Sequence, residues 1–279
     1  MLDRRSVRLA APFILPAVVF TAAVFLAPLW SVLYQSLANP DFTLAAYREI
    51  ASSRLFSRVL VNTFEISLTS TLITLLFAYP MAYHLAKQTP RRRALLMVLV
   101  LLPFWTSILV KSFAFMVILG HDGIVNTALQ WVGLPRTRLL FNRTGVVIGT
   151  AHFLIPFVLF PILTSLLAQN PDLAKAAQIM GAGRLRIFLR ITLPLSLPGV
   201  MAGCLLAMIQ SFGFYITASL LGGKSDIMMA NLVDLYTREI LNWNLASAVA
   251  VVLLLLSGLL IAVLARVRGA EAVLGGAGR

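Results

Sequence analysis

The stretch Asn170–Gly183, which reads NPDLAKAAQIMGAG, decides how the rest of this chain is interpreted. Asn170 is a good N-cap residue and Pro171 suits the first position of a helix. Gly181 and Gly183 can end that helix. Apolar or small side chains recur between these ends at helical spacing, which predicts a shared face: Leu173, Ala176, Ala177 and Met180. The stretch therefore predicts a short, separate helix.

Residues 184–194, which read RLRIFLRITLP, predict a second helical segment. Arg186 and Arg190 are one turn apart with apolar residues between them, which is typical of an interfacial helix that leads into a membrane span. A short helix that protrudes from a membrane bundle can be held by a soluble partner, and the partner's motion then passes to the spans as rigid-body movement. The pattern alone equally allows an ordinary connecting loop.

Long apolar segments lie on both sides of this loop, which we bound at residues 169–196. A helix that crosses a bilayer needs about 20 mostly apolar residues. Six segments meet that requirement: about 13–37, 62–86, 94–119, 145–168, 197–221 and 245–266. The sequence therefore predicts an all-α membrane protein, a bundle of six transmembrane helices that forms one domain over residues 1–279.

Composition and charge support a membrane protein. Hydrophobic residues make up 59% of the chain and charged residues 12%, about half the charged fraction of a soluble domain. The net charge of +13 does not indicate nucleic-acid binding, because the basic residues collect in short loops between apolar segments. With the N-terminus inside, fourteen basic residues lie in inner segments and eight in outer segments. This bias predicts that both termini and the loop 169–196 are cytoplasmic.

The loop resembles the signature E-A-A-x(3)-G-x(9)-I-x-L-P of ABC-importer permeases. Six positions match it, with the nine-residue spacer 182–190 intact: Ala176, Ala177, Gly181, Ile191, Leu193 and Pro194. Segments 102–107, 195–204 and 220–223 are similar to the spermidine/putrescine-type branch of these permeases, and the likeness covers about residues 10–266. One departure is Lys175, which stands where the family has glutamate.

The resemblance implies the MetI-like fold of type I ABC-importer permeases, in a multi-pass protein of the bacterial inner membrane. Such a chain forms half of a translocation pathway for a small organic solute, here a polyamine such as spermidine or putrescine. The implied partners are an ABC ATPase dimer, a second homologous permease subunit and a periplasmic solute-binding protein. ATP and Mg²⁺ would be bound by the ATPase, and no cofactor by this chain. Ferric iron or an amino-acid-like solute remains open as an alternative.

By the same resemblance, the loop docks into a cleft of the ATPase. The residues expected to take part in this coupling are Asp172, Lys175, Ala176, Ala177, Gly181, Ile191, Leu193 and Pro194. Lys175 reverses the charge of the family's glutamate, so any ion pair made there needs a replacement. Asp172, one turn earlier, is one candidate, and a complementary acidic residue on the ATPase is the other.

Polar and aromatic side chains within the spans are candidates for the solute pathway, since polar groups at membrane depth tend to face a cavity or a partner: Glu65, Trp105, Gln210 and Tyr215. Glu65 can attract a cationic solute, or it can pair with an outer arginine such as Arg58. Lys111 would repel a polyamine, so we expect it to snorkel or to pair. The outer loop 120–144 is the expected surface for the binding protein, with Asp226 and Asp234 as alternatives.

An intramembrane enzyme and a self-contained channel or secondary carrier are the alternative classes of function. The sequence has no G-x-x-x-x-G-K-[ST], G-x-S-x-G or H-E-x-x-H motif, and its three histidines have no metal spacing. We therefore predict no catalytic or metal-binding residue and assign ATP hydrolysis to a partner subunit. A self-contained channel or secondary carrier would give the loop 169–196 no purpose. ATP-dependent uptake that requires an added ATPase would separate these alternatives.

Overall fold

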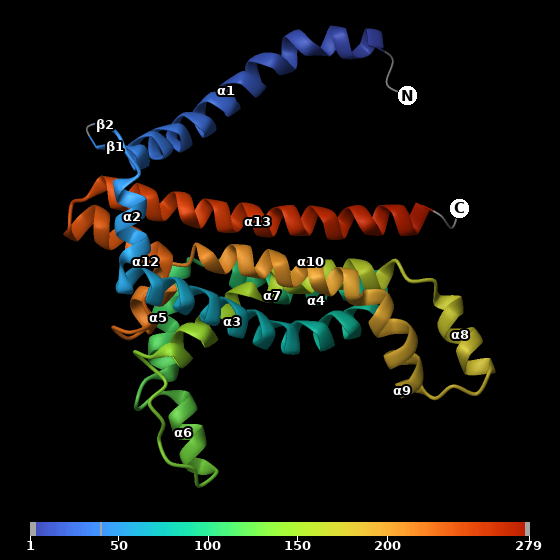
Figure 1. The fold of residues 1–279 in the computed structure, drawn as a ribbon. Coiled ribbons are helices and arrows are strands. Elements are labelled where there is room, and N and C mark those ends of the chain that lie inside the picture. The colour runs from blue at the N-terminus through green and yellow to red at the C-terminus, as the bar shows by residue number, and fades with distance from the viewer. Residues whose placement is uncertain (1–3, 40, 277–279) are drawn as a thin grey trace. The chain divides into compact units, whose positions relative to one another are not determined.

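The computed structural model describes residues 4–39 and 41–276. Helices dominate it, η1 being a 3-10 helix and η2 and η3 π-helices (Figure 1). The elements follow in this order: α1 Arg4–Leu37, β1 Ala38–Asn39, β2 Asp41–Phe42, α2 Ala45–Ser52, α3 Arg54–Ala86, α4 Pro90–Leu101, η1 Leu102–Trp105, α5 Ile108–Leu119, α6 Ile124–Trp131, α7 Arg143–Leu167, α8 Pro171–Ile179, α9 Arg184–Ile187, η2 Phe188–Thr192, α10 Leu193–Phe212, α11 Ile216–Leu221, α12 Met229–Asp234, η3 Leu235–Glu239 and α13 Trp243–Gly276.

Within the described residues, six helical stretches are long and apolar enough to cross a membrane. They are Val18–Leu37, Arg54–Ala86, Ile108–Trp131, Arg143–Leu167, Arg184–Phe212 and Trp243–Arg266. Each has the roughly 20-residue length that the hydrocarbon core of a bilayer requires. The predicted all-α architecture with six transmembrane helices is confirmed.

The segment predicted as the third span, 94–119, is divided into α4, η1 and α5. Pro103 lies in η1, and the following Thr106 has an extended backbone with ψ of 148°. Proline lacks an N–H and its ring clashes with the preceding turn, so a helix is readily interrupted there. The break leads into α5, which carries Lys111.

The chain forms two compact units, residues 1–56 with 232–253 and residues 57–231 with 254–279. In the first unit, the side-chain amide of Asn244 donates hydrogen bonds to the carbonyls of Gln35, at 3.0 Å, and of Ala38. The hydroxyls of Ser36 and Tyr47 lie 2.8 Å apart and share a hydrogen bond. The contacts of Asn244 join the start of α13 to the end of α1, and the Ser36–Tyr47 contact joins α1 to α2. A single permease domain over the whole chain stays a prediction.

The core of the second unit is formed by α3, α7 and α10, which run side by side in Figure 1. Its buried members are mainly aliphatic: Ala78, Ala82, Leu85, Leu154, Val158, Leu159, Ile162, Leu163, Leu166, Ala207 and Phe214. Two hydrogen bonds tie α3 to α7, from the hydroxyl of Ser70 to the carbonyl of Val147 and from Thr74 to Ala151, at 3.4 and 3.0 Å. Such bonds hold helices together where no water competes.

Helices α7 and α10 approach each other closely at two glycines, Gly199 and Gly203. A Cβ at Gly199 would lie 2.5 Å from the Cβ of Ser165 and 2.6 Å from the carbonyl oxygen of Pro161. A Cβ at Gly203 would lie 2.9 Å from the carbonyl oxygen of Val158. Only glycine fits at this separation, as at other close helix contacts in membranes. The two helices on either side of the loop 169–196 therefore form one tightly packed pair.

Candidate functional site

Helix α8 stands apart at one end of the second unit, beyond the C-terminus of α7 and the N-terminus of α10 (Figure 1). Asn170 caps it, because the side-chain oxygen accepts a hydrogen bond from the N–H of Asp172 at 2.9 Å. Pro171 occupies the first helical position, as predicted. Gly181 follows the helix with φ of +83°, and its N–H donates to the carbonyl of Gln178 at 2.9 Å. The predicted short helix and both of its ends are confirmed.

The face predicted for α8 is only partly buried in the structure. Ala177 is buried, whereas Leu173 and Ala176 are exposed. Ile179 and Met180, at the C-terminal end of α8, have 88% and 80% of their surface exposed. Of the four residues predicted to share one face, only Ala177 is buried, so that face is not a continuous buried surface. Two adjacent apolar side chains are left uncovered at the tip.

The charge reversal at Lys175 is balanced within the helix. Its ammonium lies 3.0 Å from Oδ1 of Asp172, one turn earlier, and both side chains are exposed. A pair of this kind contributes little to stability. Its effect is electrostatic, since it leaves this turn of α8 with no net charge. Asp172 is thus paired with Lys175 on the exposed surface of α8.

Phe188 in η2 joins the loop to α3. Its ring meets the rings of Tyr79 and Tyr83 edge-on, with centroids 5.9 and 5.4 Å apart. The hydroxyl of Tyr79 also lies 2.9 Å from that of Ser196, on α10. Edge-to-face aromatic contacts add to the free energy gained from burial. A displacement of η2 therefore acts on α3 as well as on α10.

The other residues predicted to take part in coupling lie where η2 leads into α10. Ile191 and Leu193 are half-buried, and Pro194 is exposed in the first turn of α10. The side-chain amide of Gln169 donates to the carbonyl of Thr192 at 3.0 Å, across the base of the loop. The segments before and after α8 are thus hydrogen-bonded to each other where they join the bundle.

The opposite end of the second unit is held by an ion-pair network around Arg143, the first residue of α7. Arg143 pairs with Glu65 on α3, and its Nη2 donates to Oδ1 of Asn62 at 2.6 Å. Its Nε lies 3.8 Å from Oδ1 of Asp226, which is buried and accepts a hydrogen bond from the N–H of Gly223. The network joins α3, α7 and the loop before α12.

This network changes two of the predictions. The arginine that pairs with Glu65 is Arg143, whereas the sequence suggested one such as Arg58. Asp226 is only 6% exposed and already has an arginine beside it, so it does not offer a surface for a binding protein. The pathway role of Glu65 stays a prediction. Its carboxylate is half-exposed while paired.

The four residues predicted for the pathway lie in different parts of the fold: Glu65 on α3, Trp105 in η1, Gln210 on α10 and Tyr215 just after α10. Trp105 is 83% exposed in η1, and Gln210 is exposed near the end of α10. Tyr215 follows α10, and its carbonyl accepts a hydrogen bond from the side chain of Asn231 at 3.2 Å. None of these residues, nor Glu65, lines either of the two cavities described below, and their pathway role stays a prediction.

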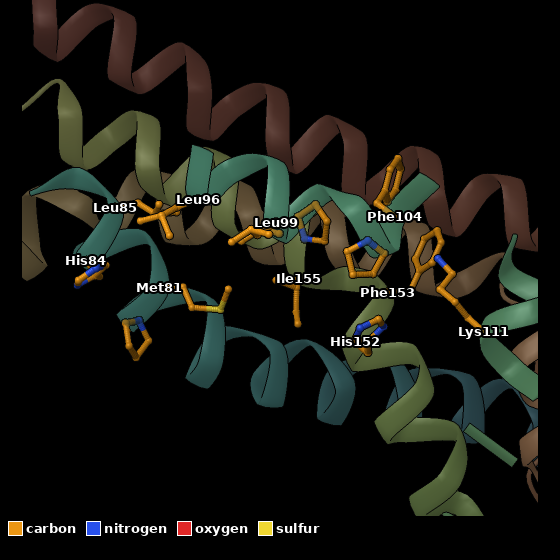
Figure 2. Close-up of a pocket in the computed structure, with 14 residues that line it drawn as sticks. Met81, His84, Leu85, Leu96, Leu99, Phe104, Lys111, His152, Phe153 and Ile155 are labelled. Atoms are coloured by element: carbon orange, nitrogen blue, oxygen red, sulfur yellow. The ribbon is translucent and has the colours of Figure 1, made fainter. Parts of the chain in front are cut away.

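The first cavity, of about 630 Å³, is lined by residues of α3, α4, η1, α5 and α7. Figure 2 shows His84 and Leu85 toward one end of it and Lys111 toward the other. Its walls are almost wholly apolar. The Nζ atom of Lys111 lies 4.6 Å from the ring centroid of Phe153 and 6.0 Å from that of Phe104. The sequence placed Lys111 in a span but gave no sign that these two rings would lie beside it.

The second cavity, of about 1350 Å³, is an apolar groove along α7 and α10. At one end it is lined by Gln169, Asn170 and Leu173 of the α8 loop, and at the other by Phe104. Phe104 lines the first cavity as well. The groove therefore runs from the base of α8 to the wall that surrounds Lys111.

Comparisons with known proteins agree on one kind of protein. Residues 70–268 match the family model described as "binding-protein-dependent transport system inner membrane component". The chain is 33% identical over 230 residues to the spermidine/putrescine transport system permease protein PotB of Escherichia coli (strain K12), covering 82% of this chain and 83% of that one.

The protein of the same name from Haemophilus influenzae is 36% identical, over 74% of this chain and 73% of its own length. A solved bacterial alginate ABC transporter, in complex with an alginate-pentasaccharide-bound periplasmic protein, includes a similar chain. That chain matches with a TM-score of 0.78 and 19% identity, over 94% of both chains. At this identity the structural likeness shows the fold alone.

Proposed function

Because this chain belongs to the family of binding-protein-dependent transport system inner membrane components, and so is a multi-pass inner-membrane permease of an ABC importer, we propose that α8 is the element through which a separate ATPase drives it. The predicted family is confirmed by these matches. The observation that carries the proposal is the tip of α8, a capped helix outside the bundle with Ile179 and Met180 exposed.

The attachment of α8 supports transmission of movement. The loop leaves α7 and returns to α10, and these helices approach so closely at Gly199 and Gly203 that a Cβ would not fit at either position. Packed interfaces tend to shift as rigid bodies between discrete arrangements. A partner that moves α8 therefore moves the α7–α10 pair as a unit, with Phe188 carrying part of that movement to α3.

The contact with the ATPase is proposed to be mainly apolar. Lys175 replaces the family's glutamate and is paired with Asp172, so this turn offers no unpaired charge among the described side chains. Ile179 and Met180 offer the apolar surface. The Asp172–Lys175 pair then supports the helix end, and the partner needs no compensating acidic residue.

The other partners follow from the kind of system. A second homologous permease subunit is proposed to supply the other half of the pathway, and an ABC ATPase dimer to bind ATP and Mg²⁺. A periplasmic binding protein is proposed to meet the α6 end, where Trp131 and Val132 are 87% and 78% exposed. In this arrangement α8 and both chain termini face the cytoplasm.

The solute is proposed to be a polyamine. Two relatives of 33% and 36% identity carry the name of a spermidine/putrescine permease. This is the support for that choice, because neither cavity in the described residues is lined by a carboxylate that would itself select a polycation. Another small solute is the alternative.

The test is uptake by the assembled importer, reconstituted in proteoliposomes with its ATPase, second permease and binding protein. We expect uptake of labelled putrescine or spermidine only when ATP and the ATPase are present. Ile179→Asp should lower ATP-driven uptake at least about tenfold, because it places a charge in an apolar contact. Gln178→Asp adds the same charge one residue earlier, on a side chain that is already polar, and should stay within about twofold.

Each part of the proposal has its own contrary result. Uptake by this chain alone, without ATPase, would indicate a channel or secondary carrier. ATP-driven uptake of another solute but not of polyamines would contradict only the proposed polyamine substrate. Normal uptake by Ile179→Asp would remove the apolar contact at the tip of α8.

A further inference from the structure

Lys111 lies in the apolar cavity without a carboxylate. Within residues 4–39 and 41–276, no Asp or Glu oxygen is within ion-pair distance of its Nζ. The ammonium lies over aromatic rings instead, because the ring centroids of Phe153 and Phe104 are 4.6 and 6.0 Å from Nζ. In Figure 2 the three side chains lie close together at one end of the cavity. A cation over an aromatic face is attracted by the ring quadrupole.

The side chain of lysine is a 4-aminobutyl group, and the same four-carbon amine unit is present in putrescine and spermidine. A pair of rings that binds the lysine ammonium can also bind an ammonium group of a polyamine, because cation–π attraction depends on charge and distance rather than on the rest of the molecule. The cavity of about 630 Å³ falls within the range of about 300–1,000 Å³ typical of small-molecule sites. Space for an alkylammonium ligand is therefore present beside the rings.

We propose that Phe104 and Phe153 form a binding site for an ammonium group of the transported amine, and that Lys111 occupies this site as an internal ligand when no solute is bound. This inference rests on the proposed polyamine substrate. It gives Lys111 a role compatible with a cationic solute, since the lysine must leave the rings before the solute can take its place.

The arrangement of helices links the exchange of Lys111 for the solute to the loop 169–196. Phe153 belongs to α7, whose C-terminus leads to α8, whereas Lys111 belongs to α5. Phe104 belongs to η1 and lines both the cavity and the groove that reaches the α8 loop. A shift of α7 relative to α5 changes the distance between the ammonium and Phe153. The ATPase can thus release Lys111 from the rings through α8 and α7.

An anionic ligand is the rival explanation of a lysine without a carboxylate. The other polar side chains of the cavity are the histidines His84 and His152. His152 meets the ring of Phe115 edge-on, at 5.3 Å between centroids, and its Nδ1 has no hydrogen-bond partner in the described part of the chain. Because Lys111 lies over a ring face, the geometry favours the aromatic site for an ammonium. Anion binding is kept as an outcome of the test.

The first experiment measures equilibrium binding of labelled putrescine to the permease–ATPase complex in nanodiscs, without binding protein. Lys111→Met removes the internal ammonium at similar length and should tighten binding about threefold to tenfold. Lys111→Arg keeps a cation that stacks on rings and should give no gain. Adding Phe153→Leu to Lys111→Met should abolish the gain, since the aromatic face is then lost.

The second experiment uses the double variant Lys111→Cys, Cys204→Ala, which leaves one cysteine in the chain. Modification with 2-aminoethyl methanethiosulfonate restores an ammonium at this position, whereas the ethyl reagent adds a neutral group of similar size. We expect the cationic adduct to weaken putrescine binding at least threefold relative to the neutral adduct. n-Butylammonium should slow the modification, and n-butanol should not.

Three results would overturn the inference. The first is equal binding by Lys111→Met and the unmodified complex. The second is a gain that survives Phe153→Leu, and the third is butyrate binding that is lost in Lys111→Met. These assays measure binding without transport, so a failure of polyamine uptake in proteoliposomes, which would remove the proposed substrate, is distinguished from a failure of the aromatic site.

Discussion

Arg143 shows how burial decides what one ion pair contributes. The Lys175–Asp172 pair on α8 is exposed on both sides, so water screens it. Arg143 instead lies beside Asp226, whose side chain is 8% exposed, and also binds Glu65 and Asn62. Arg143 is itself half-exposed, but its removal leaves the buried carboxylate of Asp226 without its cation, and a buried charge left without compensation is costly.

We predict that Arg143→Gln destabilises the protein by about 1–3 kcal/mol, because the buried carboxylate of Asp226 loses its cation. The midpoint of thermal unfolding in detergent should fall accordingly. The matched control is Arg138→Gln, at an exposed position in the loop before α7, which should change the midpoint little. An equal midpoint for Arg143→Gln and the unmodified protein would contradict the structural role of the network.

At the scale of elements, α8 depends on the residues that end it. Gly181 has φ of +83°, in the left-handed region that glycine adopts readily. Gly183 has φ of −69°, a value that proline also adopts. No atom lies within 4 Å of a Cβ built at either glycine, so space does not distinguish the two positions. Backbone conformation alone does.

We predict that Gly181→Pro abolishes coupling, whereas Gly183→Pro preserves it. Proline cannot take the positive φ of Gly181 and removes the N–H that binds the carbonyl of Gln178. The tip of α8, with Ile179 and Met180, is then misdirected. ATP-driven uptake in proteoliposomes should fall at least about tenfold for Gly181→Pro and stay within about twofold for Gly183→Pro. Normal transport by purified Gly181→Pro complexes would remove the assignment of α8.

At the scale of the whole molecule, the six spans and the basic residues together predict the orientation. An even number of spans places both termini on one side, and the excess of Lys and Arg assigns that side to the cytoplasm. Within the second unit, α6 and α8 lie at opposite ends (Figure 1). A label at each end therefore reports the orientation of that unit directly.

We predict opposite accessibility for two cysteine variants made in a Cys204→Ala background. A membrane-impermeant maleimide applied to intact spheroplasts should label Val132→Cys, beyond α6. It should label Gln178→Cys, on α8, only after the membrane is opened. Both side chains are exposed in the structure, so burial does not limit either reaction. Labelling of Gln178→Cys from outside would reverse the orientation and remove the docking of α8 to a cytoplasmic ATPase.

The short helix in the loop 169–196 was largely predictable because its signals are local. The cap at Asn170, the proline that follows it and the glycine at the end of α8 act on their own neighbours, so sequence spacing suffices to find them. Which residues of α8 are buried was not predictable. Whether Ala177 or Met180 is buried depends on how the chain returns after Gly181, which helical periodicity does not encode.

The sequence by itself determined the class of this protein, its six spans, the position of the loop and the family, because long apolar segments and short motifs carry that information within a few turns of chain. Only the tertiary structure decided which distant residues meet. It brought Arg143 to Glu65 across 78 positions and laid Lys111 over Phe153. Side-chain contacts between helices depend on the rotation, depth and crossing of each helix, and these are set by packing of the whole unit.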